Sequence, residues 1–414
     1  MTDLQIPGLG RGAAETFVRS HLSEFVSDAI VGSTRFSGGR SAALAALEAF
    51  SIGGYAARRS EVAPAHRRGA SGLSPFIRHG LLHLGEVWDF VAGGPARDVA
   101  KFHDELLWQE YARHLYARIG TDLRHPLRYQ PGGSGSPNLD RTMACIDSVV
   151  TELEDDGWMV NQARMWIASH WTVRLNGDWR TGEDWLFRHL LDGSRAANRL
   201  GWQWTVGAGT SKPYGFSRWQ VEKRAPSMCA TCSHRNRCPI ERWPAEHTPP
   251  PVAVVHPAVA SDPDFERTAG PPSVQVLSES AVDTVWLTAE SLSTADPALR
   301  ANPTTPAMFV FDAALLSRLR LSAKRLVFLT ECLAEIAGEH RGGLTIRVGD
   351  PVDELSSRSI ATTFAPVPGW RRIARKVRPV EVHPHPWLRR PGPESVASFS
   401  AWNGATHSSR KRVR

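Results

Sequence analysis

Three closely spaced cysteines are the most distinctive chemical feature of this sequence. Cys229, Cys232 and Cys238 form the pattern C-x2-C-x5-C-P, and three thiols at such spacings usually hold a metal. A tetrahedral zinc site is one interpretation, with His234 as the fourth ligand. An iron–sulfur cluster is the other, and it requires a fourth cysteine from elsewhere in the chain.

Tryptophan is unusually frequent in the same part of the sequence. The chain holds 15 Trp residues, and most of them fall between Trp88 and Trp243. Because a buried indole needs a partner for its N–H, such a cluster indicates packing, aromatic recognition or electron transfer. Packing alone is the simplest of these interpretations.

Two further patterns could direct polar groups at a ligand. The loop GASGLS (residues 69–74) offers backbone N–H and hydroxyl donors to a diphosphate, and the helix that follows adds the positive end of its dipole. Asn161 and Arg164 lie three residues apart, so both project from one helix face. Glu105 and Trp108 have the same spacing. Taken alone, each feature also fits an ordinary helix start, a solvated charge or a core residue.

Helices are needed to position these groups, and the first part of the chain predicts them. From Gly39 to about Arg224, apolar residues recur at three- and four-residue spacing, most clearly over residues 41–50 and 100–119. Convincing strand alternation is absent from this region. A proline-rich stretch (247–264) follows and predicts an extended linker.

The periodicity changes after this linker. Short apolar runs alternate with helical segments, which is typical of a parallel α/β sheet. The runs are residues 284–287, 307–312, 344–348 and 380–382, and the clearest helix is 322–340. We therefore predict a multidomain protein in which an all-helical domain precedes a smaller Rossmann-like parallel α/β domain. The predicted boundaries are 1–245 for the helical domain, 246–280 for the linker, 281–395 for the α/β domain and 396–414 for a basic tail.

Charge and composition narrow the class of protein. The formal net charge is +7 and Arg outnumbers Lys, which favours a polyanionic partner. No run of 18 apolar residues occurs, and the first residues lack a signal-peptide pattern. We expect a cytoplasmic monomer without membrane contact, in which the five cysteines are ligands or core residues rather than disulfides.

Four segments resemble the FAD-binding domain of photolyases and cryptochromes. They are residues 69–80, 102–115, 157–170 and 178–204, and they follow that family's order at roughly its spacings. The blocks GWM-N--RM and AAN--GWQW within them are highly specific. The resemblance covers about 200 residues and implies an FAD cofactor.

The resemblance also implies which residues contact FAD. The phosphate side is assigned to Tyr55, Ser71, Leu73 and Ser74. The flavin and ribose side is assigned to Phe102, Trp158, Asn161, Arg164, Asp192 and Asn198, with Asn198 facing flavin N5. Two positions depart from the family pattern, because Ser194 replaces a second acidic residue and Gln109 replaces an Arg found in many members.

A pocket for a flipped-out pyrimidine dimer is implied in the same way. In the family, the dimer contacts two Trp rings, a carboxyl group, an amide group and a Met side chain, and this chain has all five. They are Glu105, Trp108, Asn161, Met165 and Trp204. This set predicts light-dependent repair of cyclobutane pyrimidine dimers in DNA. The alternatives are a cryptochrome-like photosensor, repair of (6–4) photoproducts, and a DNA-binding protein that holds zinc or a cluster without photochemistry.

The family's electron-transfer chain of tryptophans is only partly present. Trp202 and Trp179 match its inner and middle members, but no Trp lies between Trp108 and Trp158 to match the outer one. Electrons would therefore have to pass between the protein surface and Trp179 or Trp202 through another aromatic residue or another redox centre. The candidate aromatic residues are Trp166, Trp171 and Trp185.

One branch of the family carries an iron–sulfur cluster, and this chain shares features with it. Cys145 stands ahead of the GWM block, where that branch has its distant ligand. We therefore predict a [4Fe–4S] cluster on Cys145, Cys229, Cys232 and Cys238, with zinc as the alternative. Cys332 lies in an apolar helix and is predicted to be a core residue.

The α/β segment resembles the antenna domain of photolyases, which normally precedes the FAD-binding domain. Here it follows, so we predict a permuted domain order. Its first strand lacks the usual Arg-rich continuation and its end is abridged. These differences weaken the case for a bound antenna chromophore, and the segment is expected to serve mainly as a structural partner.

Overall fold

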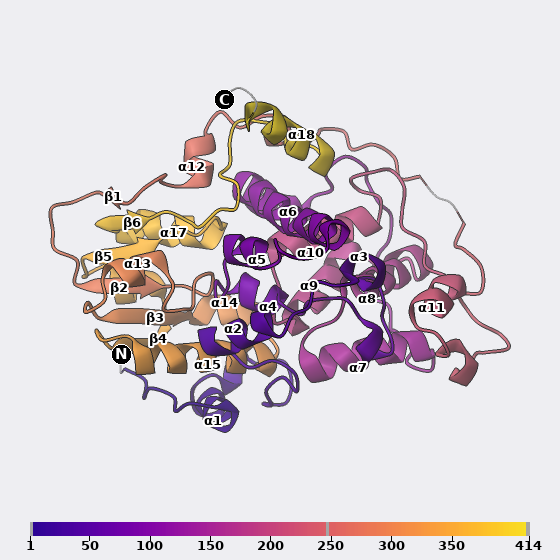
Figure 1. Ribbon diagram of the computed structural model, residues 1–414, viewed down its shortest axis with the longest axis horizontal. Helices are drawn as coiled ribbons and strands as arrows, with labels where there is room; N and C mark the ends of the chain where they lie inside the picture. Colours follow the sequence, from indigo (N-terminus) through magenta and orange to yellow (C-terminus); the bar gives the residue numbers. More distant parts are fainter. Residues whose placement is uncertain (1–2, 246–247, 411–414) are drawn as a thin grey trace.

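The computed structural model describes residues 3–245 and 248–410 and contains a helical part beside an α/β part (Figure 1). The helices of the first part are α2 (Arg40–Glu48), α3 (Tyr55–Arg58), α4 (Ser74–Arg78), α5 (Leu84–Phe90), α6 (Ala96–Ile119), α7 (Ala144–Asp156), α8 (Asn161–Ser169), α9 (Trp179–His189), α10 (Arg195–Thr205) and α11 (Arg218–Arg224). A π-helical turn, His170–Arg174, extends α8. The helices predicted at 41–50 and 100–119 are confirmed as α2 and α6.

The α/β part is a six-stranded sheet in the order β1-β6-β5-β2-β3-β4. Its strands are β1 (Gln275–Val276), β2 (Thr284–Leu287), β3 (Ala307–Asp312), β4 (Leu344–Gly349), β5 (Ile360–Thr363) and β6 (Glu381–His383). All neighbours are parallel except β1, which pairs antiparallel with β6. The four predicted strands are confirmed. β5 was missed because its four residues, IATT, form a short buried run without alternation.

Helices cover both faces of this sheet. They are α13 (Pro297–Ala301), α14 (Ala313–Leu319), α15 (Ala323–Glu339), α16 (Pro351–Leu355) and α17 (Pro368–Val377). Side chains of β3 alternate between two cores, as a strand requires. Phe309 belongs to the core that holds α15, whereas Met308 belongs to the core that holds Trp370 of α17. The core around α15 continues into the helical part, so the two parts share one buried apolar interior.

The first helix, α1 (Arg11–His21), packs against α15 rather than against the helical part. Two backbone bonds support this placement: Leu4 N donates to Ile346 O at 3.0 Å, and Ser27 N donates to Leu321 O at 3.0 Å. Residues 3–28 therefore lie on the α/β part, although the sequence grouped them with the helical domain. The apolar face of α15 that receives α1 is not distinguishable in sequence from the face that meets the sheet.

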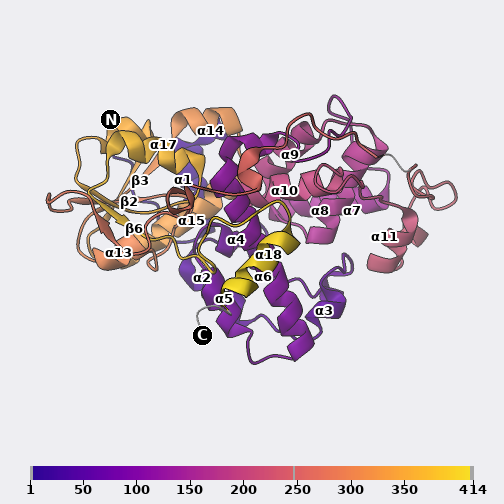
Figure 2. The same cartoon turned by 90° about the horizontal axis from the view of Figure 1, so that it is seen from above.

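The segments predicted as a linker and a tail contain regular structure. Within 246–280 the chain forms α12 (Phe265–Ala269) and the edge strand β1. The predicted basic tail begins with α18 (Phe399–Arg410), which lies along α6 in both views (Figures 1 and 2). Trp402 is fully buried there, so residues 396–404 are a packed segment and not a free extension. The last four residues of the tail lie outside the described residues.

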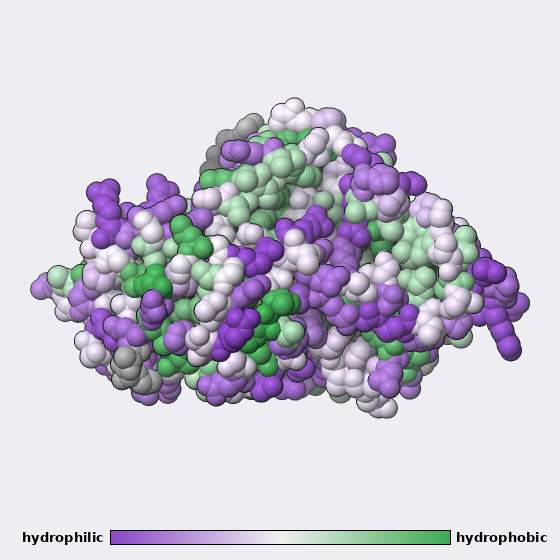
Figure 3. All heavy atoms as spheres, turned by 90° about the horizontal axis from the view of Figure 1, so that it is seen from below, coloured by the Kyte–Doolittle hydropathy of each residue, from purple (hydrophilic) through white to green (hydrophobic). Residues whose placement is uncertain are grey.

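One face of the molecule is largely hydrophilic. Hydrophilic residues cover much of the face seen in Figure 3, with smaller hydrophobic patches between them. Within residues 3–245 and 248–410, no helix is both long enough and apolar enough to cross a membrane.

Candidate flavin-binding site

The loop before α4 has the conformation that its glycine predicts. Gly72 has φ +72°, a region that side-chain-bearing residues avoid, and its α-carbon faces the guanidinium of Arg35. Ser71 Oγ accepts a bond from Leu73 N at 3.3 Å, which fixes the turn. Ser74 begins α4, and its Oγ accepts a hydrogen bond from Trp158 Nε1 at 2.9 Å. The loop 69–74 and Trp158 are therefore joined by this hydrogen bond, and their assignment to one flavin site stays a prediction.

Tyr55 and Phe102 form an aromatic wall. Their rings lie 4.9 Å apart in an edge-to-face arrangement, and both side chains are buried. Asp98 of α6 holds α3 in place, because its carboxylate accepts bonds from Gly54 N and Ala56 N at 2.8 Å each. Burial, with a further contribution from Glu105, raises the pKa of the Tyr55 phenol, so this residue is neutral at physiological pH.

The helix α8 brings three predicted residues to one place. Asn161 Nδ2 lies 3.6 Å from Met165 Sδ, one turn along the same face. Arg164 donates to Asp192 Oδ2 at 2.8 Å and to Met159 O at 3.0 Å. The second carboxylate oxygen, Asp192 Oδ1, is buried and has no hydrogen-bond partner within the described part of the chain. Since a buried oxygen of this kind is costly, it fits an acceptor for a ribose or flavin donor.

Asn198 is oriented by a carboxylate that the sequence analysis did not single out. Its Nδ2 donates to Glu183 Oε1 at 3.0 Å and to Glu183 O at 3.1 Å. With both amide protons used, the carbonyl Oδ1 is the polar atom that Asn198 presents on its other side. Two arginines pair with the Glu183 carboxylate: Arg199 at 3.5 Å and Arg195 at 2.5 Å. Burial raises the pKa of Glu183, and these two arginines oppose that rise.

Glu183 could have been found from the sequence. It lies four residues after Trp179, one helical turn along α9, within the block that carries the resemblance. Arg35 was also missed, and its guanidinium lies 4.5 Å over the Trp158 ring. No motif marks Arg35, because it comes from a segment far from this site in the sequence.

The five residues assigned to a pyrimidine dimer differ in their exposure. Trp204 is 40% exposed and its ring lies 5.5 Å from that of Tyr214. Glu105 Oε1 pairs with Arg59 Nε at 3.2 Å and with Lys101 Nζ at 3.3 Å. Asn161 is exposed, and Met165 and Trp108 are half-buried.

One face of Trp108 is already covered. The ring of Phe399, at the start of α18, stacks on Trp108 with centroids 4.0 Å apart and planes inclined by 9°. Sequence reasoning missed this contact because Phe399 falls in the segment expected to be a tail.

The four predicted cluster cysteines line one small cavity. Cys145 from α7 meets Cys229, Cys232 and Cys238 from the segment after α11. Burial, followed by the charges of the other three thiols, raises the pKa of Cys145 to about 12, so without metal this thiol is protonated. His234 Nε2 lies 2.7 Å from Thr142 Oγ1 and 3.6 Å from Asp140.

No group of three or more His, Cys, Asp or Glu side chains in the described ranges is close enough to hold a single metal ion. A tetrahedral zinc ion with Zn–S bonds of about 2.3 Å would need sulfur atoms about 3.8 Å apart. A [4Fe–4S] cube places its cysteines around a larger volume. Both the [4Fe–4S] cluster and the zinc alternative therefore stay predictions.

Trp202 and Trp179 are both buried, and Nε1 of each lacks a partner among the described residues. Cys332 is buried in α15, as predicted, and its Sγ accepts a bond from Gly39 N at 3.3 Å. It lies apart from the other four cysteines, in the core shared by the two parts of the molecule.

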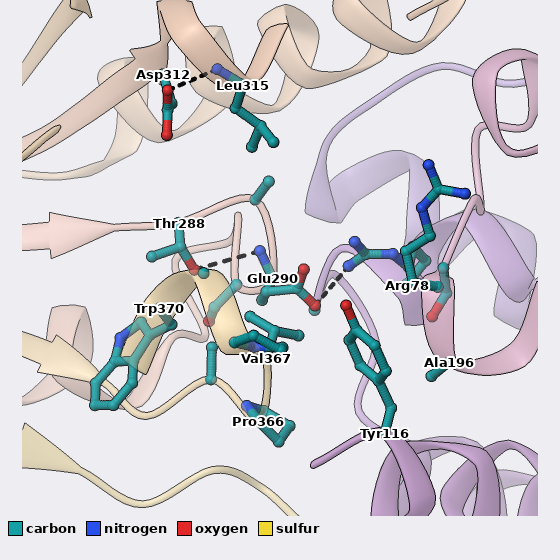
Figure 4. Close-up of a pocket in the computed structure, with 18 of the residues that line it drawn as sticks. Arg78, Tyr116, Ala196, Thr288, Glu290, Asp312, Leu315, Pro366, Val367 and Trp370 are labelled. Carbon is teal, nitrogen blue, oxygen red and sulfur yellow. Dashed lines mark hydrogen bonds and ion pairs between the residues drawn. The ribbon is translucent and has the colours of Figure 1, made fainter. Parts of the chain in front are cut away.

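A separate cavity of about 860 Å³ lies between the helical part and the carboxyl ends of β2, β3 and β5. Figure 4 shows Arg78 paired with Glu290 across it, Tyr116 entering from the helical side and Trp370 from the α/β side. Ten arginines line this cavity against four acidic residues, which gives it a strongly positive lining. It lies at the sheet edge where doubly wound folds bind ligands.

Comparison with known proteins finds similarity within the helical part of the chain. Residues 101–227 match the model of the FAD binding domain of DNA photolyase. Over these residues the chain is therefore similar to the FAD-binding domain of photolyases.

The curated relatives that match the chain are named deoxyribodipyrimidine photo-lyase. The chain is 28% identical over 226 residues to the deoxyribodipyrimidine photo-lyase of Synechococcus sp., covering 50% of this chain and 45% of the relative. It is 31% identical over 166 residues to that of Vibrio cholerae, covering 36% and 35%. The chain thus spans less than half the length of these relatives. Among solved structures, a bacterial class III photolyase from Agrobacterium tumefaciens is similar, with 27% identity, coverage of 45% and 42% and a TM-score of 0.38.

Proposed function

We propose that this chain is a light-dependent flavoprotein that repairs cyclobutane pyrimidine dimers in DNA. The observation that carries the proposal is the convergence on α8 of Asn161, Arg164 and Met165, with Asp192 paired to Arg164. Relatives named deoxyribodipyrimidine photo-lyase are similar to part of the chain, and residues 101–227, which include α8, match the FAD binding domain of DNA photolyase. When bound in its reduced form, FAD supplies a light-driven electron to the dimer and takes it back after the ring has split.

The protein's part in this reaction is to bind, orient and exclude water. The loop 69–74 holds the phosphates, Arg164 and Asp192 hold the ribose and flavin side, and Asn198 presents its carbonyl oxygen to the flavin edge. Trp108 and Trp204 stack on the extruded bases, while Glu105 and Asn161 hydrogen-bond to their polar edges. The excess of Arg holds the DNA backbone, so affinity falls as salt rises.

The proposal includes two finer features. A [4Fe–4S] cluster on Cys145, Cys229, Cys232 and Cys238 joins α7 to the segment after α11. The α/β part corresponds to the antenna domain in permuted order. The sheet order β4-β3-β2-β5-β6 supports this, since it is the order of a doubly wound nucleotide-binding fold.

A cryptochrome-like photosensor is the second candidate, and one observation favours it. Phe399 occupies a face of Trp108 that a dimer would need, so α18 must move before substrate can stack there. A sensor would use the same contact as its output, because a change at the flavin would release or retain α18.

Illumination of the fully reduced protein with dimer-containing DNA tests the repair function. Loss of dimers on illumination, and none in the dark, is the expected result. Unchanged dimers with wild-type protein and with a Phe399→Ala variant would overturn repair, since that variant removes the covering ring. Protein purified without flavin would overturn both candidates.

A further inference from the structure

A row of three indoles leads from the flavin side of the helical part to its surface. Trp202 lies one turn after Asn198 on α10 and is buried. The ring of Trp171 lies 6.4 Å from that of Trp202 in an edge-to-face arrangement. Trp171 in turn stacks on Trp185 of α9 with centroids 5.8 Å apart and planes inclined by 16°. Trp185 is half-buried, so the row ends where solvent can reach it.

The backbone is shaped to hold this row. Trp171 belongs to the π-helical turn after α8, and the extra residue of such a turn rotates a side chain relative to a regular helix. Its Nε1 donates to Asp178 O at 3.0 Å, which fixes the ring. The helices α8, α9 and α10 contact one another around it (Figure 1).

Gly182 makes the close approach possible. A Cβ at this position would lie 2.3 Å from the Trp202 ring and 2.9 Å from Trp171 Nε1. Only a residue without a side chain lets α9 contact both indoles at once. Gly182 thus allows both Trp202 and Trp171 to pack against α9.

We infer that Trp171 and Trp185 carry electrons between the protein surface and Trp202, in place of a route through Trp179 to the outer tryptophan that this sequence lacks. The inference rests on the proposed flavin site. Of the alternatives, Trp166 stacks on Phe216 at 5.3 Å, away from this row, and Trp179 lies at the wall of the large cavity beneath the Arg180 guanidinium.

The electrons balance as follows. For each photon absorbed by the bound flavin, one electron would pass from Trp202 to the flavin, Trp202 would take one from Trp171, and Trp171 would take one from Trp185. The oxidised Trp185 loses its indole N–H proton to water. A dithiol reductant then returns one electron and one proton to Trp185, and two such events convert the dithiol to a disulfide while FAD gains two electrons.

The test is photoreduction of the oxidised, FAD-loaded protein under blue light with dithiothreitol. Trp171→Phe and Trp185→Phe are expected to slow photoreduction at least tenfold, and the tryptophan radical seen by transient absorption should be lost or shortened. Trp185→Tyr should restore part of the rate, because tyrosine can also be oxidised. Trp219→Phe, at a 56% exposed indole on α11, is the matched control and should leave the rate unchanged.

The flavin content of each variant separates the possible failures. Variants that keep FAD and photoreduce at the wild-type rate would overturn the route through Trp171 and Trp185. A large loss in Trp179→Phe with none in Trp171→Phe would assign the electrons to Trp179 instead. Wild-type protein that binds no FAD would overturn the proposed function itself. Reduction with dithionite should leave the Trp171→Phe variant as active in dimer repair as the wild type.

Discussion

Phe399 and Trp108 lie face to face, with ring centroids 4.0 Å apart and planes inclined by 9°. The two residues are separated by almost 300 positions in the chain, and one belongs to α18 and the other to α6. The contact is anchored on both sides: Tyr111 donates to Val396 O at 2.8 Å, and Trp402 Nε1 donates to His114 Nδ1 at 3.0 Å. The carboxyl-terminal segment is therefore positioned over the aromatic face that the sequence assigns to substrate.

Removing the Phe399 ring should strengthen binding of dimer-containing DNA. An aromatic pair contributes about 0.5–1.5 kcal/mol beyond its buried area, so Phe399→Ala should lower the Kd for a single-dimer oligonucleotide about threefold to tenfold. Fluorescence anisotropy at fixed salt measures this. Phe90→Ala, at a 45% exposed position on α5, is the control and should leave the Kd unchanged. Equal affinities for the wild type and Phe399→Ala would show that substrate does not use this face of Trp108.

The anchor of α18 should weaken in acid. Burial, together with the charges of Arg118, Arg389 and Arg113, lowers the pKa of His114 from 6.5 to about 3, and the hydrogen bond to the Arg389 carbonyl opposes this shift. The neutral ring accepts from Trp402 and donates to Arg389 O at 2.8 Å. Because the pKa of His114 is lower in the folded state than in the unfolded state, the contribution of neutral His114 to the free energy of unfolding is complete above pH 6.5. It declines as the pH falls toward 3.

Urea unfolding at several pH values measures the effect of His114. Below pH 6.5 the free energy of unfolding of the wild type should fall by up to about 1.4 kcal/mol per pH unit because of His114 alone. His114→Gln should show a correspondingly shallower slope, since glutamine does not titrate. The same slope in both proteins would contradict the prediction.

Glu183 should matter more than its neighbour Asp184, although both contact Arg195. The Glu183 side chain is 3% exposed and also holds Asn198, whereas that of Asp184 is 57% exposed. Glu183→Gln should lower the free energy of unfolding by about 2 kcal/mol, because Arg199 loses its counter-charge and Arg195 keeps only that of the exposed Asp184. Asp184→Asn should change it by less than about 0.5 kcal/mol. Similar values for the two variants would rule out a special role for Glu183.

The cysteine prediction has a matched control within the chain. Substitution of any of Cys145, Cys229, Cys232 or Cys238 by Ala should abolish the iron content and the broad visible absorption of a cluster, while Cys332→Ala should keep both. Metal analysis and absorption spectra of anaerobically purified protein measure this. Zinc in place of iron, with loss of the metal in His234→Ala, would favour the Cys3His alternative.

Gly182 should tolerate no side chain. Gly182→Ala places a methyl group 2.3 Å from the Trp202 ring, so α9 or the indoles must shift, at a cost of about 1–3 kcal/mol. Gly201→Ala on α10, with nothing within 4 Å of the added carbon, should instead be neutral or stabilising by up to about 1 kcal/mol. Thermal unfolding compares the two variants. If Gly182→Ala were as stable as Gly201→Ala, the close packing of Trp202 and Trp171 would be wrong.

Local pattern was sufficient for much of this protein. The helices α2, α6 and α15 and four of the six strands follow from apolar spacing, because that spacing reports which side of an element is buried. The blocks around Trp158 and Asn198 predicted a flavin site, and the structure brings Ser74 to Trp158 and Asp192 to Arg164. Three of the four cluster cysteines are conspicuous by spacing alone.

Contacts between distant segments were decided only by the tertiary structure. Nothing in the sequence around Phe399 indicates that it stacks on Trp108, and nothing around Trp171 distinguishes it from Trp166 as the neighbour of Trp202. The placement of α1 on α15 is of the same kind. The physical reason is that periodicity identifies a buried face without identifying the surface that buries it. That choice depends on the shape and packing of the whole molecule.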